Sequence, residues 1–350
     1  MTIYQHIVEY NSNDGIGNDI TGLSDLFFRL NLNNKVITLK NKFSVNNDNI
    51  IELGIKKSYF NNQDIHILHY GSAGYPLNYF LDLPGKKILR FHNITPVNFF
   101  KKFCDENIYT ILEDSYKLSI IELKSLVLDI NEIWYDSLFN QKTLNSFFSF
   151  NNSTLKEKIY PIFRKYTKFI RNDFNINYNL LYTGRIVPHK KIEDILFTLY
   201  FLKKISETYK LFIVGKVSKE FVRYYQFLNK IIVELNLEKN IKWMLDTNEE
   251  ELIILRNNSA FYISMSEHEG FGIPILEAFA QGIPVIAYDT TAVGETLRSG
   301  GIRILEKKFE YIAEIIHSIN LNPNLKSQIC KTQYNELDYY ENNYQQSDLI

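Results

Sequence analysis

The chain has 350 residues, 45% of them hydrophobic, which is enough for two compact domains rather than one. Its 39 basic and 40 acidic residues give a net charge of −1, so no charge imbalance points to nucleic acid. Two cysteines, Cys104 and Cys330, are too few for a metal cage or a disulfide framework, which favours a reducing cytoplasm. We find neither a signal peptide nor an apolar run that could span a bilayer, and expect a cytoplasmic protein, soluble or peripheral to the membrane.

Short apolar runs alternate with segments of helical period, the pattern of parallel sheets covered by helices. One series of predicted strands lies at residues 3–8, 36–39, 65–70, 87–91 and 132–135, and a second at 179–183, 210–214, 241–243, 260–263 and 284–287. We therefore predict an α/β fold with two Rossmann-like domains facing across a cleft. The domains span residues 1–165 and 179–325, with a linker near 164–178 and a helical tail at 326–350.

A glycine-containing loop at residues 11–20 joins the first predicted strand to a helix that we expect to begin near Asn18. Gly15 and Gly17 would let a ligand approach the backbone, and the helix behind them would supply free amides. A dinucleotide fingerprint would need a small residue where Ile20 stands and an acid after the second strand, so NAD is not expected. A plain tight turn is the alternative.

His92 directly follows an apolar strand and precedes Pro96, which prevents a regular continuation. The carboxyl ends of strands in such sheets face the ligand crevice, so His92 is a candidate catalytic residue. A structural histidine is the alternative. His69 also ends a strand, and it is a second candidate, for the acceptor side.

Arg185 and Lys190 lie between a strand ending at Thr183 and a helix beginning near Ile192. A planar guanidinium and a point charge on one strand-to-helix loop can converge on a diphosphate. Together they would neutralise the charge that grows as a sugar–phosphate bond breaks. The alternative is a solvated loop with ordinary basic residues.

Residues 262–288 place Glu269 and Glu277 on either side of a glycine turn that runs into Pro274. Proline suits the first helical position, so we expect Glu269 on the loop and Glu277 in the first turn of the helix. Free amides at a helix N-terminus favour a phosphate, and four turn residues would form that site: Gly270, Phe271, Gly272 and Ile273. Two acids would repel the phosphate unless they face uncharged hydroxyls, as they would with a nucleotide sugar. The alternative is a strand, a turn and a helix with two exposed acids.

Two motifs resemble the retaining glycosyltransferases of family four. The pattern E-G-F-G-x-P-x-x-E-A is met by residues 269–278, and G-R-x-x-P-x-K by residues 184–190. The resemblance implies a GT-B type fold, a nucleotide-sugar donor held mainly by the C-terminal domain, and transfer with retention. Lys191 stands where many relatives have glycine, so the resemblance does not rank Lys190 against Lys191 as phosphate ligands.

The same resemblance implies roles for single residues. Glu269 and the amides beside Phe271 would hold the donor sugar, and Glu277 would accept hydrogen bonds from the ribose. The phrase F-H-N-I-T-P is similar to a stretch of polysaccharide-building members, in which the histidine lies next to the transferred sugar; here that is His92. The glycine loop at residues 15–17 would line the cleft, and the tail would cross back onto the first domain.

The motifs predict an enzyme, a hexosyltransferase that builds a lipopolysaccharide O-antigen, capsule or exopolysaccharide on a lipid-linked acceptor. The sequence has no Asp-x-Asp metal motif, so we expect catalysis without metal or other cofactor. GDP-mannose is the donor favoured by resemblance and UDP donors stay open, because the base depends on the backbone near Gly215 and Leu245. An epimerase or hydrolase of nucleotide sugars and a non-catalytic binding subunit are the alternatives. Residues 99–103, with their phenylalanines and lysines, would either touch a bilayer or cover a helix.

Overall fold

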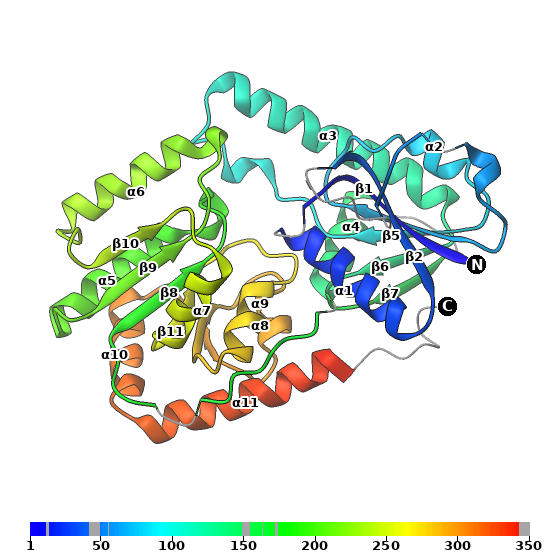
Figure 1. Cartoon of the computed structure of the whole chain (residues 1–350). Helices are drawn as coiled ribbons and strands as arrows, with labels where there is room; N and C mark the ends of the chain where they lie inside the picture. The colour runs from blue at the N-terminus through cyan, green and yellow to red at the C-terminus, as the bar shows by residue number, and fades with distance from the viewer. Residues whose placement is uncertain are drawn as a thin grey trace. The chain divides into compact units, whose positions relative to one another are not determined.

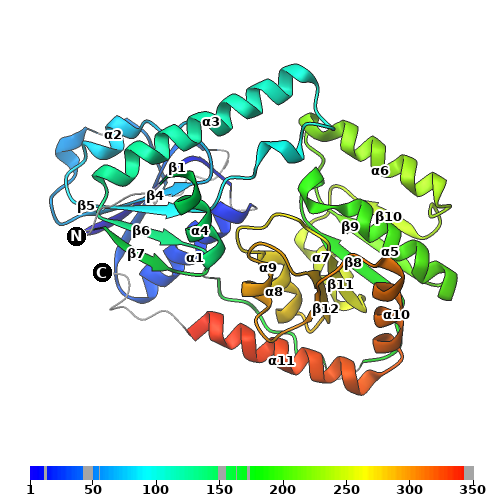
Figure 2. The ribbon, with the colours of Figure 1, turned by 180° about the vertical axis from the view of Figure 1, so that it is seen from behind.

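The structure is a computed structural model that describes residues 1–11, 14–41, 50–54, 56–148, 155–162, 164–171 and 174–342. Within these residues the chain forms two units, one of residues 1–97 and 110–165 and the other of residues 98–109 and 166–342. Each unit is a parallel sheet with helices on both faces (Figures 1 and 2). The predicted α/β fold with two Rossmann-like domains is confirmed.

The first unit has a seven-stranded sheet in the order β3-β2-β1-β4-β5-β6-β7. Its strands are β1 (Thr2–Tyr10), β2 (Asn33–Asn41), β3 (Ile50–Glu52), β4 (Ile65–Tyr70), β5 (Lys86–Phe91), β6 (Glu132–Tyr135) and β7 (Lys156–Ile159). Its helices are α1 (Gly15–Arg29), α2 (Leu77–Leu81), α3 (Glu106–Asp129) and α4 (Leu138–Phe147), with 3-10 turns at Lys57–Tyr59 and Val97–Phe99. The first four residues of α3 belong to the second unit.

The strands of this sheet are apolar on both faces because both faces are covered. In β4, Ile65 and Ile67 pack in one core with Phe27 of α1, whereas Leu68 and Tyr70 pack in another with residues of α3. Successive side chains of a strand point to opposite faces, so odd-numbered residues of β4 face α1 and even-numbered residues face α3. This alternation separates the histidines of the unit into two groups, described below.

The second unit has a six-stranded sheet in the order β10-β9-β8-β11-β12-β13. Its strands are β8 (Asn179–Thr183), β9 (Lys210–Val214), β10 (Ile241–Met244), β11 (Phe261–Ser264), β12 (Val285–Tyr288) and β13 (Ile302–Ile304). Its helices are α5 (Ile192–Ile205), α6 (Val222–Glu234), α7 (Glu249–Asn257), α8 (Ile273–Ala280), α9 (Val293–Leu297), α10 (Phe309–Asn320) and α11 (Pro323–Asn342), with 3-10 turns at Pro188–Lys190 and Lys219–Phe221.

The predicted strands are confirmed, and the structure adds three short ones, β3, β7 and β13. Each lies at a sheet edge, where one face or side is open to solvent. The sequence of β7, Lys-Glu-Lys-Ile, carries no apolar run, and a three- or four-residue strand gives too little alternation to be recognised.

The helical tail packs on the second unit as far as Asn342, and its expected crossing onto the first domain stays a prediction. Its buried side chains explain this packing. The Gln333 amide exchanges hydrogen bonds with Val285 N and Ile283 O, and the Tyr340 hydroxyl donates to Glu295 O at 2.9 Å. Residues 343–350 lie outside the described part of the chain.

Residues 99–103 cover a helix, which was one of the two predicted alternatives. Phe100 is buried against Phe221, and Phe103 packs edge-on against Tyr224 and at 5.1 Å from Phe227, both on α6. None of the described helices is both long enough and apolar enough to cross a bilayer.

Candidate functional site

Both sheets have the doubly wound order in which the first and fourth strands lie side by side, here β1 with β4 and β8 with β11. The chain winds outward in opposite directions from such a pair, which leaves a crevice outside the carboxyl ends of the two strands. Ligands of open α/β sheets bind there. For each unit we can therefore ask whether the candidate residues lie at this crevice.

In the second unit, the loop after β8 carries the predicted phosphate-binding cations. Arg185 is exposed, and its guanidinium has neither a salt bridge nor a hydrogen bond to any residue that the structure describes. Two glycines bring the neighbouring loop close, because a Cβ on Gly215 would lie 1.8 Å from Gly184 O. Only glycine permits that approach of two backbones.

Lys190 and Glu269 form an ion pair across the switch point of this sheet. Lys190 Nζ lies 2.6 Å from Glu269 Oε1, and the two side chains are only 15% and 16% exposed. Glu269 lies on the loop after β11, as predicted, and its backbone N–H donates to Thr291 Oγ1 at 3.0 Å. The pair therefore joins the loops that follow two adjacent strands.

The glycine turn leads directly into α8. Gly272 is the residue before the helix and has φ of 107°, a left-handed conformation in which other residues are strained. Phe271 is buried against Tyr340, and Thr296 Oγ1 donates to Phe271 O. Ile273 opens the helix, with its N-terminus toward the crevice side of the sheet. The turn is thus fixed from both sides, which suits a preformed anion site.

Glu277 lies one residue later in the helix than predicted. Because α8 begins at Ile273, Glu277 falls in the second turn rather than the first. Its Oε2 accepts from Arg256 Nη2 at 2.5 Å, and both side chains are largely buried, at 17% and 8% exposed. Neither Glu269 nor Glu277 is an exposed surface residue, so the alternative interpretation, a helix with two exposed acids, is wrong.

Lys191 differs from Lys190 in both backbone and contacts. It has φ of 49°, in the left-handed region, at the residue before α5. Its Nζ lies 3.6 Å from Glu193 and 3.5 Å from Glu267, both longer than the contact of Lys190 with Glu269. Glycine adopts this left-handed backbone without strain, which gives a physical reason why the resemblance led us to expect a glycine at this place.

Two buried histidines flank this loop. Burial lowers the pKa of His189 well below its usual range, and burial lowers the pKa of His268 to about 4. Their rings meet edge-on at 6.2 Å, and Phe99 packs against both. Both rings are therefore neutral at pH 7, and the positive charge beside the crevice comes from Arg185 and the lysines.

In the first unit, the glycine loop differs from the prediction. Helix α1 begins at Gly15, three residues before the expected start, because the Asp14 side chain caps it. Asp14 Oδ1 accepts from Gly17 N at 2.8 Å, so the Gly17 amide is not free for a ligand. Gly15 has open space where a side chain would lie. The lining of a ligand crevice by Gly15 and Gly17 stays a prediction.

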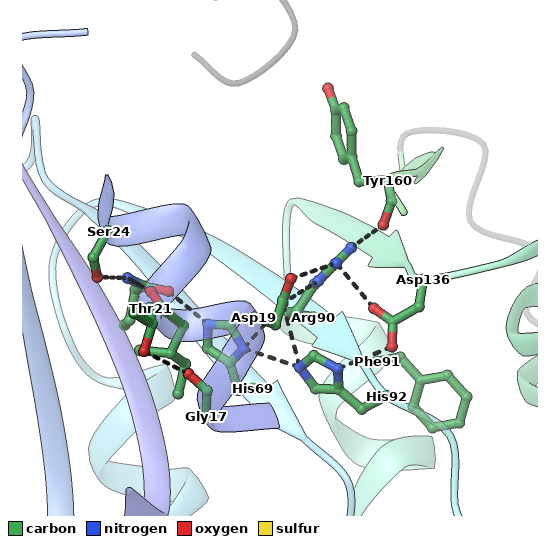
Figure 3. A network of polar contacts seen from close by, with 12 residues as sticks. Gly17, Asp19, Thr21, Ser24, His69, Arg90, Phe91, His92, Asp136 and Tyr160 are labelled. Atoms are coloured by element: carbon green, nitrogen blue, oxygen red, sulfur yellow. Dashed lines mark hydrogen bonds and ion pairs between the residues drawn. The ribbon is translucent and has the colours of Figure 1, made fainter. Parts of the chain in front are cut away.

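His92 follows β5 as predicted, with both ring nitrogens engaged (Figure 3). His92 Nδ1 lies 2.9 Å from Asp136 Oδ2, and Nε2 lies 2.9 Å from Nδ1 of His69. His69 is buried with 0% of its side chain exposed, so the expectation that it lines the acceptor side is wrong. The role of His92 beside a transferred sugar stays a prediction, and its ring has no nitrogen to spare for it here.

Three charged residues beneath His92 were missed by sequence reasoning. Arg90 donates to both oxygens of Asp19, from Nε at 2.8 Å and from Nη2 at 3.0 Å, and Nη2 also lies 3.0 Å from Asp136 Oδ1. All three side chains are at most 2% exposed. The signal in the sequence was indirect: Arg90 and Asp136 stand at or just after the carboxyl end of a predicted strand, and Asp19 stands at the start of a predicted helix.

Asp19, His69 and His92 have ligand atoms within 4.8 Å of one another, the geometry of a possible metal site among the described residues. Arg90 already occupies both Asp19 oxygens, and a guanidinium beside a divalent cation would repel it. Every ring nitrogen of the two histidines also has a protein partner. The donor set therefore fits an internal hydrogen-bonded network. Metal-independent catalysis stays a prediction.

Comparisons with known proteins agree with the fold and with the second unit in particular. Residues 167–336 match the family model described as glycosyl transferases group 1. The chain is 32% identical over 152 residues to the O-antigen chain mannosyltransferase RfbU of Salmonella typhimurium, covering 42% of this chain and 40% of that protein. It is 28% identical over 145 residues to a GDP-mannose:cellobiosyl-diphosphopolyprenol alpha-mannosyltransferase of Xanthomonas oryzae pv. oryzae, covering 41% and 37%.

The matches to these two curated relatives thus span about two fifths of their length. Among solved structures, the pneumococcal O-GlcNAc transferase GtfA in complex with UDP and GlcNAc has a TM-score of 0.72 at 11% identity, covering 97% of this chain and 96% of that one. At this identity the likeness establishes the fold, which is that of the GT-B glycosyltransferases.

Proposed function

We propose, because this chain belongs through residues 167–336 to the group 1 glycosyl transferases, that it transfers a hexose from a nucleotide diphosphate sugar to a growing cell-surface glycan. The observation that carries the proposal is the ion pair between Lys190 and Glu269 beside the exposed Arg185. It gathers two cations and one carboxylate at the crevice of the second unit, where a donor carries both phosphate and hydroxyl groups.

The cations act on the leaving group. Arg185 presents an open planar fork that can take two phosphate oxygens, and Lys190 supplies a point charge that is already oriented by Glu269. The charge on the departing nucleotide diphosphate grows as the bond to the sugar breaks. Groups fixed in advance stabilise that charge without reorganisation, and removing one such donor costs about 3 kcal/mol.

The two carboxylates face uncharged groups in this proposal. Glu269 accepts hydrogen bonds from hydroxyls of the transferred hexose, and Glu277 accepts from the ribose. Arg256 supports the second role, because its contact with Glu277 at 2.5 Å holds that carboxylate in place. The amides at the start of α8 add the positive end of the helix dipole toward a phosphate.

For the donor we propose GDP-mannose, and for the acceptor a polyprenol-diphosphate-linked glycan. The names of both curated relatives support mannose, and one of them supports GDP and a diphosphopolyprenol acceptor. The UDP in the GtfA complex supports the more general statement that this fold accepts a uridine nucleotide. Because the acceptor would be anchored in a membrane, we also propose peripheral contact with the membrane's cytoplasmic face.

Thermal unfolding with GDP, UDP, ADP and their hexose conjugates tests the donor. A ligand at one hundred times its Kd stabilises the folded state by about 2.7 kcal/mol, so the preferred base gives the largest rise in Tm. We expect GDP and GDP-mannose to stand out. No rise with any nucleotide or nucleotide sugar would overturn the proposal.

An assay with and without acceptor separates transfer from the two alternatives. A transferase consumes the donor fully only when a lipid-linked acceptor is present. An epimerase or hydrolase would consume it without one. A non-catalytic subunit would bind the donor and give no product with any acceptor in the panel.

A further inference from the structure

The buried network of Figure 3 contains more hydrogen bonds than two neutral histidines can supply with protons. Three bonds run in a line. His69 Nε2 lies 2.9 Å from Gln5 Oε1, His69 Nδ1 lies 2.9 Å from His92 Nε2, and His92 Nδ1 lies 2.9 Å from Asp136 Oδ2. Each bond needs one proton. An amide oxygen and a carboxylate oxygen, which end the line, supply none, and two neutral imidazoles carry only two protons.

We propose that the His69–His92 pair carries one positive charge in the folded protein, held by Asp136, and that Asp136 is a positioning residue for the His92 ring. With three protons on four ring nitrogens, all three hydrogen bonds are made. His92 then donates to Asp136 and to His69, and His69 donates to Gln5. The bond to Asp136 then joins two ionised groups, so electrostatic attraction between whole charges adds to it.

The charges around the pair favour this state. The groups that face it are Asp19 from α1, Arg90 from β5 and Asp136 after β6. His6 of β1 lies on the other face of the sheet, where it pairs with His66. Two carboxylates and one guanidinium leave a net charge of −1, which one imidazolium cancels. Asp19 Oδ2 lies 3.6 Å from His69 Nδ1 and 3.7 Å from His92 Nε2, close to the central bond of the line. A buried cluster without net charge costs far less than a buried carboxylate without a partner.

The charge resides on the ring of His92. Burial first, and the neighbouring His92 second, lower the pKa of His69 well below its usual range. Arg90 Nη2 lies 3.0 Å from Asp136 Oδ1, so the other oxygen of that carboxylate is the one that accepts from His92. The two ring planes are 12° from parallel with centroids 5.2 Å apart, so the rings meet edge to edge along their hydrogen bond, and the His92 ring lies between His69 and Asp136.

A rotated Gln5 amide is the competing assignment. In that assignment the Gln5 amide donates to His69, His69 donates to His92, and His92 donates to Asp136, so both rings are neutral. The rotation would also turn the amide oxygen toward Ile20 O, now 3.3 Å from Gln5 Nε2. A backbone carbonyl is an acceptor only, so this contact would become repulsive. The contact with Asn34 Oδ1 at 3.1 Å would become repulsive too unless the Asn34 amide also rotated, whereas the Ile20 carbonyl has no such alternative.

The opposite face of the same sheet holds a second histidine pair that serves as an internal control. His6 Nδ1 lies 2.7 Å from Tyr75 Oη, His6 Nε2 lies 3.0 Å from His66 Nδ1, and His66 Nε2 lies 3.0 Å from Pro84 O. Here the tyrosine hydroxyl supplies the third proton. Both rings can be neutral with every bond made, and burial lowers the pKa of His66 to about 4.

For function, the inference rests on the proposed transfer reaction. His92 begins the loop after β5, where Asn93 has a left-handed φ of 72° and donates to Asn140 Oδ1 at 2.8 Å. A ring bonded on both nitrogens cannot rotate, so the loop starts from a fixed point at the carboxyl edge of the sheet. The buried cation also contributes to the electrostatic field at that edge.

Nitrogen-15 NMR tests the charge without reference to activity. The sample is the full-length protein, labelled at histidine and treated with a chelator. Ring nitrogens with and without a proton have well-separated shifts, and a His92→Gln variant assigns the signals. We expect three protonated nitrogens in the His69–His92 pair and two in the His6–His66 pair at pH 7. Two protonated nitrogens in the His69–His92 pair would overturn the proposal.

Asp136→Asn separates the charge from the hydrogen bonds. The amide can donate to His92 Nδ1, after which both rings are neutral and each bond is still made. We expect the pair to show two protonated nitrogens in this variant, with the His6–His66 signals unchanged. An unchanged count of three would overturn the role of Asp136. The wild-type count decides the main proposal even if the variant does not fold.

The kinetic measurement tests the positioning role. For Asp136→Asn we expect kcat to fall on the order of tenfold with KM for the donor nearly unchanged. The wild-type rate should decline at high pH as the pair loses its third proton, and that decline should be absent in the variant. A change in Tm alone, with the same pH profile, would show a structural role and overturn this part. Failure of the transfer reaction itself would leave the spectra as they are.

Discussion

The carboxyl edges of the two sheets use charge in opposite ways, although both have the same doubly wound strand order. In the first unit, Asp19, Arg90 and Asp136 are buried, and the single guanidinium contacts both carboxylates. In the second, Arg185 is exposed and the Lys190–Glu269 pair is only partly buried. The comparison shows that this fold gathers polar side chains at the carboxyl edge of each sheet. Burial then decides whether those side chains stabilise the protein or remain available to a ligand.

The largest effect should follow from removing the buried guanidinium. Arg90→Met keeps most of the side-chain volume and leaves the Asp19 and Asp136 carboxylates without their cation. Breaking a buried ion pair on one side costs about 3–5 kcal/mol, so the free energy of unfolding in urea should fall by that amount. A loss below about 0.5 kcal/mol would show that the two carboxylates are not charged when buried.

The matched substitution in the second unit should affect turnover instead of stability. For Arg185→Met we expect the free energy of unfolding to stay within about 0.5 kcal/mol, because the side chain is exposed and unpaired among the described residues. Turnover should fall by about a hundredfold or more, the cost of one lost donor to the leaving group. Near-normal turnover in both Arg185→Met and Lys190→Ala would refute the assignment of the phosphate-binding loop.

A third measurement concerns what the units share, a buried neutral histidine. Burial lowers the pKa of His66 in the first unit and of His268 in the second to about 4. An unfolded imidazole has a pKa near 6.5, so the unfolded chain binds more protons between these values. The stabilisation is therefore present above pH 6.5 and is lost as the pH falls toward 4, by roughly 3 kcal/mol for each histidine.

The slope of the unfolding free energy against pH measures those protons. We expect His66→Gln and His268→Gln each to reduce the slope between pH 4.5 and 6 by up to one proton relative to the wild type. A reduction in only one of the two variants would mean that the other histidine is charged when folded. The carboxylates contribute equally to all three proteins and cancel in the differences.

The sequence located the polar groups at the carboxyl edge of the second sheet better than those of the first, for a physical reason. Arg185, Lys190 and Glu269 lie within or beside short fixed motifs after two adjacent strands, and spacing along the chain is enough to place them at one edge. Arg90 and Asp19 are 71 residues apart in the sequence, and their pairing depends on which face of β5 packs against α1. That information is in the packing, so a periodic pattern alone does not contain it.

Arg256 teaches the same lesson within the second unit. Glu277 was identified from its motif, whereas its partner on the last turn of α7 has no motif and stands 21 residues away. The predicted start of α1 was wrong for a local reason, because we did not recognise Asp14 as the residue that caps the helix. Strand positions and the fold class succeeded because apolar runs in a doubly covered sheet are strong signals.

The smallest expected effect ranks the two lysines that the motif left unranked. Lys191→Gly removes a side chain whose Nζ is 3.5 Å or more from its acidic neighbours and relieves a left-handed backbone at φ of 49°. Glycine adopts this conformation freely but adds disorder to the unfolded chain, so the net change in unfolding free energy should be within about 1 kcal/mol. Turnover should stay within about threefold of the wild type, because Lys190 alone makes the short contact with Glu269. If Lys191→Gly instead loses turnover as Lys190→Ala does, both lysines neutralise the phosphate charge. The carboxyl edge of the second sheet would then offer its ligand three cations, Arg185, Lys190 and Lys191.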